Sequence, residues 1–385
     1  MTPTFLIGLA TCVAWTYLVL GRGFFWLARE RDDGEPACAP PSSWPSVVAV
    51  VPARNEADVV ERALGSLLAQ DYPGDLRIIL VDDDSTDATA AIARRIADAH
   101  LGPARLEVIA GAALESGWTG KLWALSQGIS HAAAAAPEFL LLTDADIAHA
   151  PDNLRQLVLR AQAGGLTLTS LMARLTVETW AERLLIPAFV FLFAMLYPFA
   201  WVNDPQRRTA AAAGGCMLVR RDALEAAGGI DAIAGEIIDD CALAARLKRQ
   251  GPIWLGLSNR AVSMRPYAGL GDIGRMVARS AYAQLRFSPL LLAGAVAGMG
   301  LVYAAPPLLG LFGAGSARWT GVAAWAVMGL VFQPMLRFYR LSPLWGLALP
   351  LIGALYGAFT VASAVDVWRG RGGMWKGRAQ AAFSP

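Results

Sequence analysis

A short apolar run that ends in two carboxylates constrains the fold of this chain more than any other stretch. Residues 139–142 are apolar, and Thr143 then leads into Asp144-Ala145-Asp146. Such a run is typical of a buried strand in a parallel sheet, and ligands bind beyond the carboxyl ends of these strands. In an extended chain Asp144 and Asp146 point the same way, and two hard oxygen ligands suit Mg²⁺ or Mn²⁺. The alternative is a loop whose Asp residues cap the next helix.

Three earlier apolar runs alternate with segments of helical periodicity. The expected strands are 47–51, 77–81 and 105–109, and the expected helices are 58–70, 88–100 and 120–136. This order predicts an α/β fold with a parallel sheet and helices on both of its faces. Neither a G-x-G-x-x-G sequence nor a Walker glycine loop follows the first strand. We therefore expect a nucleotide-binding sheet without the dinucleotide or P-loop fingerprint.

Carboxylates also follow the second expected strand. The segment 82–87 reads Asp-Asp-Asp-Ser-Thr-Asp, immediately before a predicted helix. A helix N-terminus favours acidic residues, which explains Asp87. It explains Asp82 and Asp83 poorly, because these end a buried strand and would repel each other. A strand-end Asp can instead bind a ribose hydroxyl or a base N–H group.

Three further positions stand at predicted element ends. Lys121 opens a helix, where a cation opposes the helix dipole, so we expect it to have a partner. A diphosphate is one candidate, and a solvated lysine is the alternative. Gly214 and Gly215 enter a strand expected over 214–219 and allow close backbone approach to a ligand. Asp239 and Asp240 precede an amphipathic helix, where one carboxylate can cap and the other can act as a general base.

The composition indicates a membrane protein. The chain is 55% hydrophobic and 17% charged, with 13 Trp, its mean hydropathy is +0.43, and soluble domains average about 25% charged residues. A net charge of +2 gives no indication of nucleic-acid binding. The four Cys are scattered, which argues against a disulfide framework or a zinc site.

The order of these motifs between residues 47 and 264 resembles a family 2 glycosyltransferase with a GT-A catalytic domain. The motifs are Pro52-Ala53-Arg54-Asn55-Glu56, the acidic segment 82–87, Gly120-Lys121, Asp144-Ala145-Asp146, Gly214-Gly215-Cys216 and Asp239-Asp240. Further features look closest to the membrane glycosyltransferases associated with hopanoid biosynthesis. These are the N-terminal apolar segment and the stretches 202–205, 238–241 and 283–289.

The resemblance implies a role for each motif. The nucleotide-sugar would be bound by Pro52, Ala53, Arg54, Glu56, Asp82, Asp83, Lys121, Asp144, Gly214 and Gly215. Asp146, with Asp144, would bind Mg²⁺ or Mn²⁺ on the diphosphate, and Asp240 beside Asp239 would deprotonate the acceptor hydroxyl. The reaction would be an inverting transfer from a UDP-sugar, with GDP left open, to a lipid acceptor such as a hopanoid or another polyisoprenoid.

Two positions depart from the family pattern. Asp239 stands where the family usually has Glu. The stretch 284–287 lacks the Trp of the Q-x-x-R-W element found in processive members and has a different spacing, which favours transfer of a single sugar. A processive polysaccharide synthase is one alternative. A transporter with a regulatory nucleotide-binding domain is another, although the expected spans carry almost no ionisable residues.

The expected domain order places a catalytic domain between membrane segments. We expect an anchor over 1–28, a linker over 29–45, a GT-A domain over 46–268, an interfacial helix over 269–288, a membrane bundle over 289–368 and a basic tail over 369–385. The three arginines Arg22, Arg29 and Arg31 follow the first span, and this charge pattern predicts a catalytic domain in the cytoplasm. We expect the membrane to be a bacterial inner membrane. The apolar segment 184–202 is expected to be interfacial or re-entrant, because a span would separate Asp146 from Asp240. Its two prolines at 187 and 198 are also expected to break a helix.

An amphipathic helix expected over 272–287 would contact the membrane on the acceptor side. In a continuous helix one face carries Arg275, Arg279, Tyr282 and Arg286, which suits anionic headgroups, and Gln284 lies nearby. The alternative is a solvated arginine stripe. Three spans are expected over 289–312, 319–336 and 343–367. Three spans would put the tail outside, but the basic tail residues Arg369, Arg371, Lys376 and Arg378 indicate that it is inside. One segment, with 343–367 as the candidate, is therefore expected to be re-entrant or split.

Overall fold

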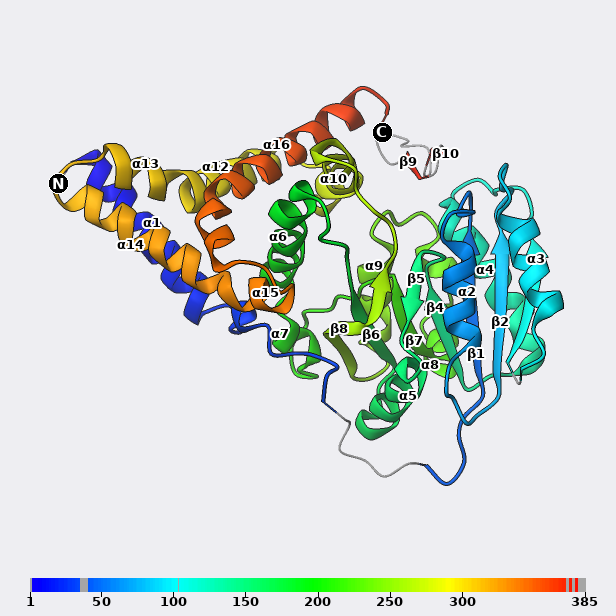
Figure 1. The fold of residues 1–385 in the computed structure, drawn as a ribbon. Coiled ribbons are helices and arrows are strands. Elements are labelled where there is room, and N and C mark those ends of the chain that lie inside the picture. Colours follow the sequence, from blue (N-terminus) through cyan, green and yellow to red (C-terminus); the bar gives the residue numbers. More distant parts are fainter. Residues whose placement is uncertain (1, 35–40, 103, 372–373, 376–377, 380–385) are drawn as a thin grey trace. The chain divides into compact units, whose positions relative to one another are not determined.

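The computed structural model describes residues 2–34, 41–102, 104–371, 374–375 and 378–379 (Figure 1). Part of the expected linker, with Cys38, and the tail residues Lys376 and Gly377 lie outside these residues. The contacts divide the chain into two compact units. The helical unit comprises Met1–Arg29, Thr176–Ala200 and Pro266–Gly373, and the sheet unit comprises Glu30–Leu175, Trp201–Arg265 and Met374–Pro385.

The sheet unit is built on an eight-stranded sheet in the order β3-β2-β1-β4-β7-β6-β8-β5. Its strands are β1 (Val47–Ala53), β2 (Leu76–Asp82), β3 (Arg105–Ala110), β4 (Phe139–Thr143), β5 (Ile147–His149), β6 (Leu168–Arg174), β7 (Cys216–Arg220) and β8 (Ile253–Ser263). Neighbours are parallel from β3 to β4 and between β6 and β8. β7 runs antiparallel to β4 and β6, and β5 runs antiparallel to β8.

Helices cover both faces of this sheet, as the alternation of elements predicted. Every residue of β1 is buried. Its odd-numbered residues from Val47 to Ala53 share a core cluster with α2 (Val60–Leu68) and α5 (Asn153–Gly164). On the other face α4 (Gly120–Ala132) packs so closely that a Cβ at Gly128 would lie 2.4 Å from Cγ1 of Val50.

The remaining elements of the sheet unit are short. They are α3 (Thr89–Ala99), the 3-10 turns Ala133–Ala135 and Asp231–Ile233, α8 (Arg221–Ala226), α9 (Asp239–Leu247), and the two-residue strands β9 (Met374–Trp375) and β10 (Arg378–Ala379). α7 (Phe199–Asn203) precedes the loop that leads to β7. The predicted positions of strands 1 to 4 and their connecting helices agree with these bounds to within a few residues.

The helical unit contains four apolar stretches long enough to cross a membrane: Pro3–Leu20, Pro289–Phe312, Gly315–Phe338 and Pro343–Trp368. Its helices are α1 (Pro3–Leu20), α6 (Trp180–Leu196), α10 (Leu270–Ala278), α11 (Ala281–Gln284), α12 (Pro289–Met299), α13 (Ala305–Phe312), α14 (Gly315–Val331), α15 (Gln333–Phe338) and α16 (Leu349–Trp368), with short 3-10 or π segments at Phe25–Leu27, Gly300–Ala304 and Pro343–Ala348. The expected set of one N-terminal and three C-terminal apolar segments is confirmed.

Two helix predictions were wrong. Pro187 does not break α6, which continues to Leu196 and ends before Pro198. A capping box between Thr179 and Glu182 stabilises the start of α6, and Pro187 is buried within it, so packing outweighs the missing hydrogen bond.

The helix expected over 272–287 is in fact two helices, α10 and α11. Arg286 adopts a left-handed conformation with φ of 51°, and Tyr282 is 1% exposed. The arginines therefore do not form one continuous helical face with Tyr282.

Candidate active site

The candidate active site lies where the carboxyl ends of β2, β1 and β4 meet. The register pairs Ala53 with Asp82 across β1 and β2, and Thr143 with Cys216 across β4 and β7. The carbonyl of Gly215 accepts hydrogen bonds from Asp144 N at 3.3 Å and from Thr143 Oγ1 at 2.8 Å. Motifs that are far apart in the sequence therefore reach the same edge of the sheet.

The loops after β1 and β2 are tied together by side-chain hydrogen bonds. Asn55 N donates to Ser85 Oγ at 3.0 Å, and Glu56 N donates to Thr89 Oγ1 at 2.8 Å. In return, Asn55 Oδ1 accepts from Thr86 N at 2.8 Å. Asn55 has a φ of 51°, a left-handed conformation that asparagine tolerates better than most residues. These polar residues give the two loops one defined conformation.

Asp87 lies directly before α3, and backbone amides donate hydrogen bonds to its carboxylate. Its Oδ1 accepts from Thr89 N at 2.9 Å, and its Oδ2 accepts from Ala57 N at 3.1 Å. Burial acts to raise the pKa of Asp87, but the hydrogen bonds outweigh it and lower the pKa. The carboxylate of Asp87 therefore serves to order the protein's own loops.

Asp82 and Asp83 differ from Asp87 because they are buried at the strand end. Asp82 is 9% exposed and Asp83 is 1% exposed. Arg54 donates to the backbone carbonyls of Asp83 and Asp84, and its Nη1 lies 3.8 Å from the side-chain carboxylate of each of these two residues. Within the described residues, Oδ1 of Asp82 accepts no hydrogen bond. A buried acceptor of this kind is costly, and a ligand hydroxyl or N–H group would satisfy it.

Lys121 lies between carboxylates and is not a solvated lysine. Its Nζ lies 2.9 Å from Asp144 Oδ1 and 3.2 Å from Asp239 Oδ2, and its side chain is 16% exposed. Burial acts to lower the pKa of Lys121, but Asp144 and Asp239 outweigh it and raise the pKa. The predicted partner exists, and in this structure it is a pair of carboxylates. A Cβ at Gly214 would lie 3.0 Å from Nζ, so the glycine leaves room for this ammonium.

Asp240 is held by two backbone amides, and its carboxyl has a raised pKa. Its Oδ2 accepts from Gly214 N at 3.0 Å, and its Oδ1 accepts from Cys241 N at 2.7 Å. Burial, helped by the charge of Asp239, raises the pKa of Asp240 to about 6. A base works best when its pKa lies near the operating pH.

Asp146 is held by a cation that the sequence analysis missed. Arg265 Nε lies 2.8 Å from Asp146 Oδ2, and the same guanidinium lies 2.8 Å from Glu56 Oε1. The signal was weak: a single arginine just beyond β8. Residues 144–146 form a turn closed by a hydrogen bond from Ile147 N to Asp144 O at 3.2 Å, so the expectation of an extended chain there was wrong.

The site carries more carboxylates than cations, and this bears on metal binding. Asp144, Asp146, Asp239, Asp240 and Glu56 face only Lys121 and Arg265 among these contacts. No group of three potential ligands is placed to hold a metal among the residues that the structure describes. Two carboxylates with spare negative charge nevertheless fit Mg²⁺ or Mn²⁺, which take their remaining ligands from substrate phosphates and water.

A buried histidine supports the end of β4. Asn153 Nδ2 donates to His149 Nδ1 at 2.8 Å, so the ring proton is on Nε2, which lies 3.0 Å from Thr143 Oγ1. That hydroxyl in turn donates to the carbonyl of Gly215. Burial lowers the pKa of His149 to about 4, so the ring is neutral. Sequence reasoning found only an isolated histidine here. Thr143 and Asn153 lie within six residues of it in the chain, but only the fold directs their side chains at the ring.

Comparison with known proteins identifies the fold that carries this site. Residues 48–228 match the family model described as glycosyl transferase family 2. This segment is a family 2 glycosyltransferase domain. The match includes the predicted nucleotide-sugar residues and ends before Asp239 and Asp240.

The curated relatives match only part of this chain. An N-acetylglucosaminyltransferase of Mesorhizobium japonicum is 29% identical over 202 residues, which cover 50% of this chain and 42% of the relative. The succinoglycan biosynthesis protein ExoO of Rhizobium meliloti is 34% identical over 121 residues, which cover 31% of each chain. The chain spans less than half the length of these relatives.

A solved structure confirms the fold class. The mannosyltransferase PcManGT from Pyrobaculum calidifontis, solved with GDP-Man and Mn²⁺, gives a TM-score of 0.55 at 22% identity. The match covers 95% of this chain and 99% of that one. At this identity the likeness shows the fold alone, which is the predicted GT-A α/β fold with apolar helices.

The residues predicted on the acceptor side belong to the helical unit, and the other predicted site residues belong to the sheet unit. Arg275 is ion-paired with Asp272, and Arg279 and Arg286 are exposed. Gln284 exchanges hydrogen bonds with the hydroxyl of Tyr197 at 2.8 and 3.0 Å. Their role toward an acceptor stays a prediction.

Proposed function

We propose that this protein is a membrane-bound inverting glycosyltransferase that moves one sugar from a nucleotide-sugar to a hydroxyl of a lipid acceptor. The observation that carries the proposal is Asp240. Its carboxylate is held by the amide of Gly214, its pKa is raised to about 6, and it adjoins the Lys121–Asp144–Asp239 contacts at the carboxyl edge of the sheet. A base in that position suits a single displacement at a sugar carbon.

The residues divide between donor binding and chemistry. Arg54, Asp82 and Asp83 would bind the base and ribose, with Oδ1 of Asp82 as the acceptor that the protein leaves unsatisfied. Lys121 would lie beside the diphosphate or the transferred sugar. The acceptor oxygen bonds to the sugar carbon as the bond from that carbon to the diphosphate oxygen breaks. The proton of the acceptor hydroxyl passes to Asp240.

Asp144 and Asp146 would hold a divalent cation, Mg²⁺ or Mn²⁺. When bound, the cation would neutralise charge on the departing nucleoside diphosphate. The excess of carboxylates over cations supports this assignment, because it leaves negative charge for a cation to balance. PcManGT was solved with Mn²⁺.

The lipid acceptor rests on the apolar helices and on the resemblance. Four stretches of 18 to 26 residues could cross a membrane, which favours an acceptor that is itself in the membrane. The resemblance to hopanoid-associated enzymes makes a hopanoid or another polyisoprenoid our preferred acceptor. The arginines after the first apolar helix support a catalytic domain in the cytoplasm. We assign the protein to a bacterial inner membrane.

A processive polysaccharide synthase is the second candidate. The observation in its favour is the similarity to ExoO, whose name refers to succinoglycan biosynthesis. The missing Trp at the stretch 284–287 argues for single transfer. Long polymer among the products would decide for the synthase.

The test is donor binding by purified protein in detergent. UDP- and GDP-sugars are screened with and without Mn²⁺ or Mg²⁺ for protection against thermal unfolding, because a ligand that binds the folded state raises its stability. We expect one nucleotide-sugar to protect in a metal-dependent way. Asp146→Ala should lose this protection, and Asp98→Ala, a change at an exposed carboxylate on α3, should keep it. Equal protection of both variants would remove Asp146 from the metal site.

A further inference from the structure

A pocket on α4 lies outside the groups assigned above. It has a volume of about 720 Å³ and is formed by α4, the end of β3, the loop before α4 and the turn at Asp231–Ile233. Its lining residues are Ile109, Glu115, Trp118, Trp123, Ser126, Gln127, Ser130, His131, Asp231 and Ala234. All of them belong to the sheet unit.

Two tryptophans supply the apolar surface of the pocket. The rings of Trp118 and Trp123 lie 5.2 Å apart with an interplanar angle of 58°. Trp123 Nε1 donates to Ala112 O at 3.2 Å, and Gln127 Oε1 accepts from Ala112 N at 2.6 Å. Gln127 Nε2 also donates to Trp123 O at 3.1 Å. The indole of Trp123 is thus anchored before any ligand arrives.

The polar groups of the pocket are carboxylates, hydroxyls, an amide and the ring of His131, whose Nε2 lies 2.8 Å from Glu107 Oε1. Ser126 Oγ donates to Asp231 Oδ1 at 3.3 Å, and Glu115 and Ser130 are exposed. No Lys or Arg is present among the described residues that line it. Two carboxylates without a lysine or arginine to offset them make the pocket a poor site for the nucleotide diphosphate.

We propose that this pocket binds a neutral saccharide. The C–H faces of a sugar ring match the flat apolar faces of the tryptophans, and its hydroxyls can donate to Glu115 and Asp231. This combination of aromatic surface with a few fixed polar groups is what a small-ligand site requires. The ligand is separate from the donor sugar of the proposed function, and the assignment does not depend on that function.

The pocket is joined to the candidate active site by the backbone. Thr119 N donates to Ala234 O at 2.9 Å, and Thr119 caps the helix that carries Lys121. Ala234 lies five residues before Asp239 in the chain. A saccharide in this pocket would therefore contact the two segments that lead to Lys121 and to the Asp239–Asp240 pair. Its source would be either a sugar already attached to the acceptor or a free glycan.

The experiment measures saccharide binding by the full chain. The protein is purified in a polyoxyethylene ether detergent, which has no sugar headgroup, and is titrated with cellobiose, mannobiose and diacetylchitobiose by saturation-transfer difference NMR. We expect saturable binding of at least one disaccharide. Trp118→Ala should weaken it about tenfold, because the stacking surface is lost, whereas Trp118→Phe should retain most of it. Trp180→Ala, which removes an exposed tryptophan of the helical unit, is the matched control.

A second variant guards against a folding defect in Trp118→Ala. Glu115 is exposed on a loop, so Glu115→Ala should fold normally and weaken binding about threefold to tenfold through the lost hydrogen bond. No disaccharide binding by folded wild type, or binding that neither variant weakens, would overturn the proposal. Tetramethylammonium is titrated in parallel, since carboxylates with aromatic rings also suit a cation. Binding of that cation in place of every disaccharide would likewise overturn the proposal.

The same titration separates this inference from the proposed function. Asp240→Asn should bind the disaccharide as wild type does, because Asp240 is not among the lining residues. If disaccharide binds and no nucleotide-sugar protects the protein, only the proposed function fails. A glycolipid that bears the same disaccharide is then compared with the free sugar. Tighter binding of the glycolipid would assign the saccharide to the acceptor, and equal binding would assign it to a free glycan.

Discussion

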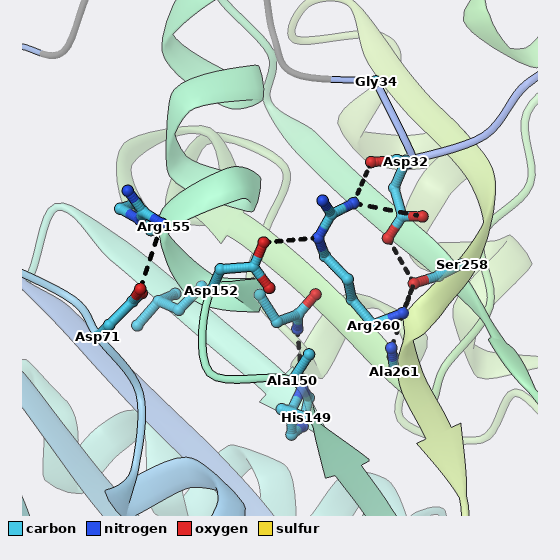
Figure 2. A network of polar contacts seen from close by, with 12 residues as sticks. Asp32, Gly34, Asp71, His149, Ala150, Asp152, Arg155, Ser258, Arg260 and Ala261 are labelled. Atoms are coloured by element: carbon cyan, nitrogen blue, oxygen red, sulfur yellow. Dashed lines mark hydrogen bonds and ion pairs between the residues drawn. The ribbon is translucent and has the colours of Figure 1, made fainter.

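Two clusters of charged residues in the sheet unit use the same chemical groups to different ends. One is the candidate active site. The other, which we call the β8 clamp, is formed by Asp32, Ser258, Arg260 and Asp152 (Figure 2). In the clamp, Arg260 donates to Asp152 Oδ2 at 2.9 Å and to the carbonyl of Asp32. Ser258 donates to Asp32 Oδ2 at 2.5 Å.

The polar groups of the clamp hydrogen-bond to other groups of the protein. Asp32 N donates to Leu257 O at 3.0 Å, and Leu257 N donates to Glu30 O at 2.8 Å, so the chain before residue 34 pairs with β8. Arg160 Nη2 also donates to Gly34 O at 3.3 Å. The clamp thus holds the segment that follows the first apolar helix against the edge of β8.

The difference shows which feature marks a ligand site here. Burial raises the pKa of Asp32 in the clamp, as it raises that of Asp240 in the site, so a shifted pKa does not distinguish them. The balance of charge does distinguish them. Beside the clamp, Arg160 and Arg260 act on Asp32 and Asp152, and the neighbouring Asp33 is paired with Arg31 at 3.8 Å. The part of the site around Lys121 and Arg265 has five carboxylates for these two cations. Excess negative charge is what a bound divalent cation would balance.

The largest expected effect is the loss of activity when the proposed base of the candidate active site is replaced. Asp240→Asn should lower kcat by about 10²–10⁴-fold, because the amide cannot take the acceptor proton. Donor protection against thermal unfolding should persist in this variant. Asp152→Asn in the clamp is the control and should change the rate less than about threefold. Wild-type transfer rates in Asp240→Asn would rule this carboxylate out as the base.

The converse change should damage stability and spare the site. Arg260→Ala removes the guanidinium that lies 3.8 Å from the carboxylate of Asp32, a residue that is 5% exposed. We expect the free energy of unfolding to fall by about 3 kcal/mol, measured as a lower thermal midpoint, with donor affinity unchanged. Serine at 258 would still donate to Asp32. A donor affinity that falls together with the midpoint would show that the clamp and the site are coupled.

His149 should make stability depend on pH. Its pKa in the folded protein is about 4, below the ordinary value of 6.5. The unfolded chain therefore binds a proton at His149 before the folded protein does. The free energy of unfolding is unaffected above about pH 6.5 and falls by up to about 3 kcal/mol as the pH is lowered toward 4. Thermal midpoints measured from pH 7 to 4.5 should fall less steeply in His149→Asn, after the loss at pH 7 is taken into account. Parallel curves for the two proteins would mean that His149 does not titrate as its burial implies.

The smallest expected effect is on the pH dependence of the rate. Asp240 must be ionised to accept a proton, so kcat/KM should rise with pH through about 6 and then level off. Between pH 7 and pH 5 the ionised fraction falls about tenfold, and kcat/KM should fall equally. Asp152→Asn should give the same profile, because its carboxylate belongs to the clamp. A rate that is flat across this range would contradict the raised pKa.

Much of this protein was predictable because the signals are local. The apolar runs of β1, β2 and β4 and the four apolar stretches of the helical unit follow from the order of residues in short windows. So does the placing of carboxylates at strand ends, since those positions immediately follow each run. The GT-A fold and the residues Asp144, Asp146, Asp239 and Asp240 came from such patterns and from the resemblance that their order carries.

Tertiary structure alone decided how those residues are paired. Lys121 contacts Asp239 across more than a hundred residues of chain, and Arg265 contacts Asp146 and Glu56 in the same way. The antiparallel insertion of β7 beside β4 sets Gly214 next to Asp240, and it sets the Gly215 carbonyl above Thr143 and His149. Periodicity and capping report only on near neighbours, whereas these contacts depend on which strands pair, and that choice minimises the free energy of the whole core.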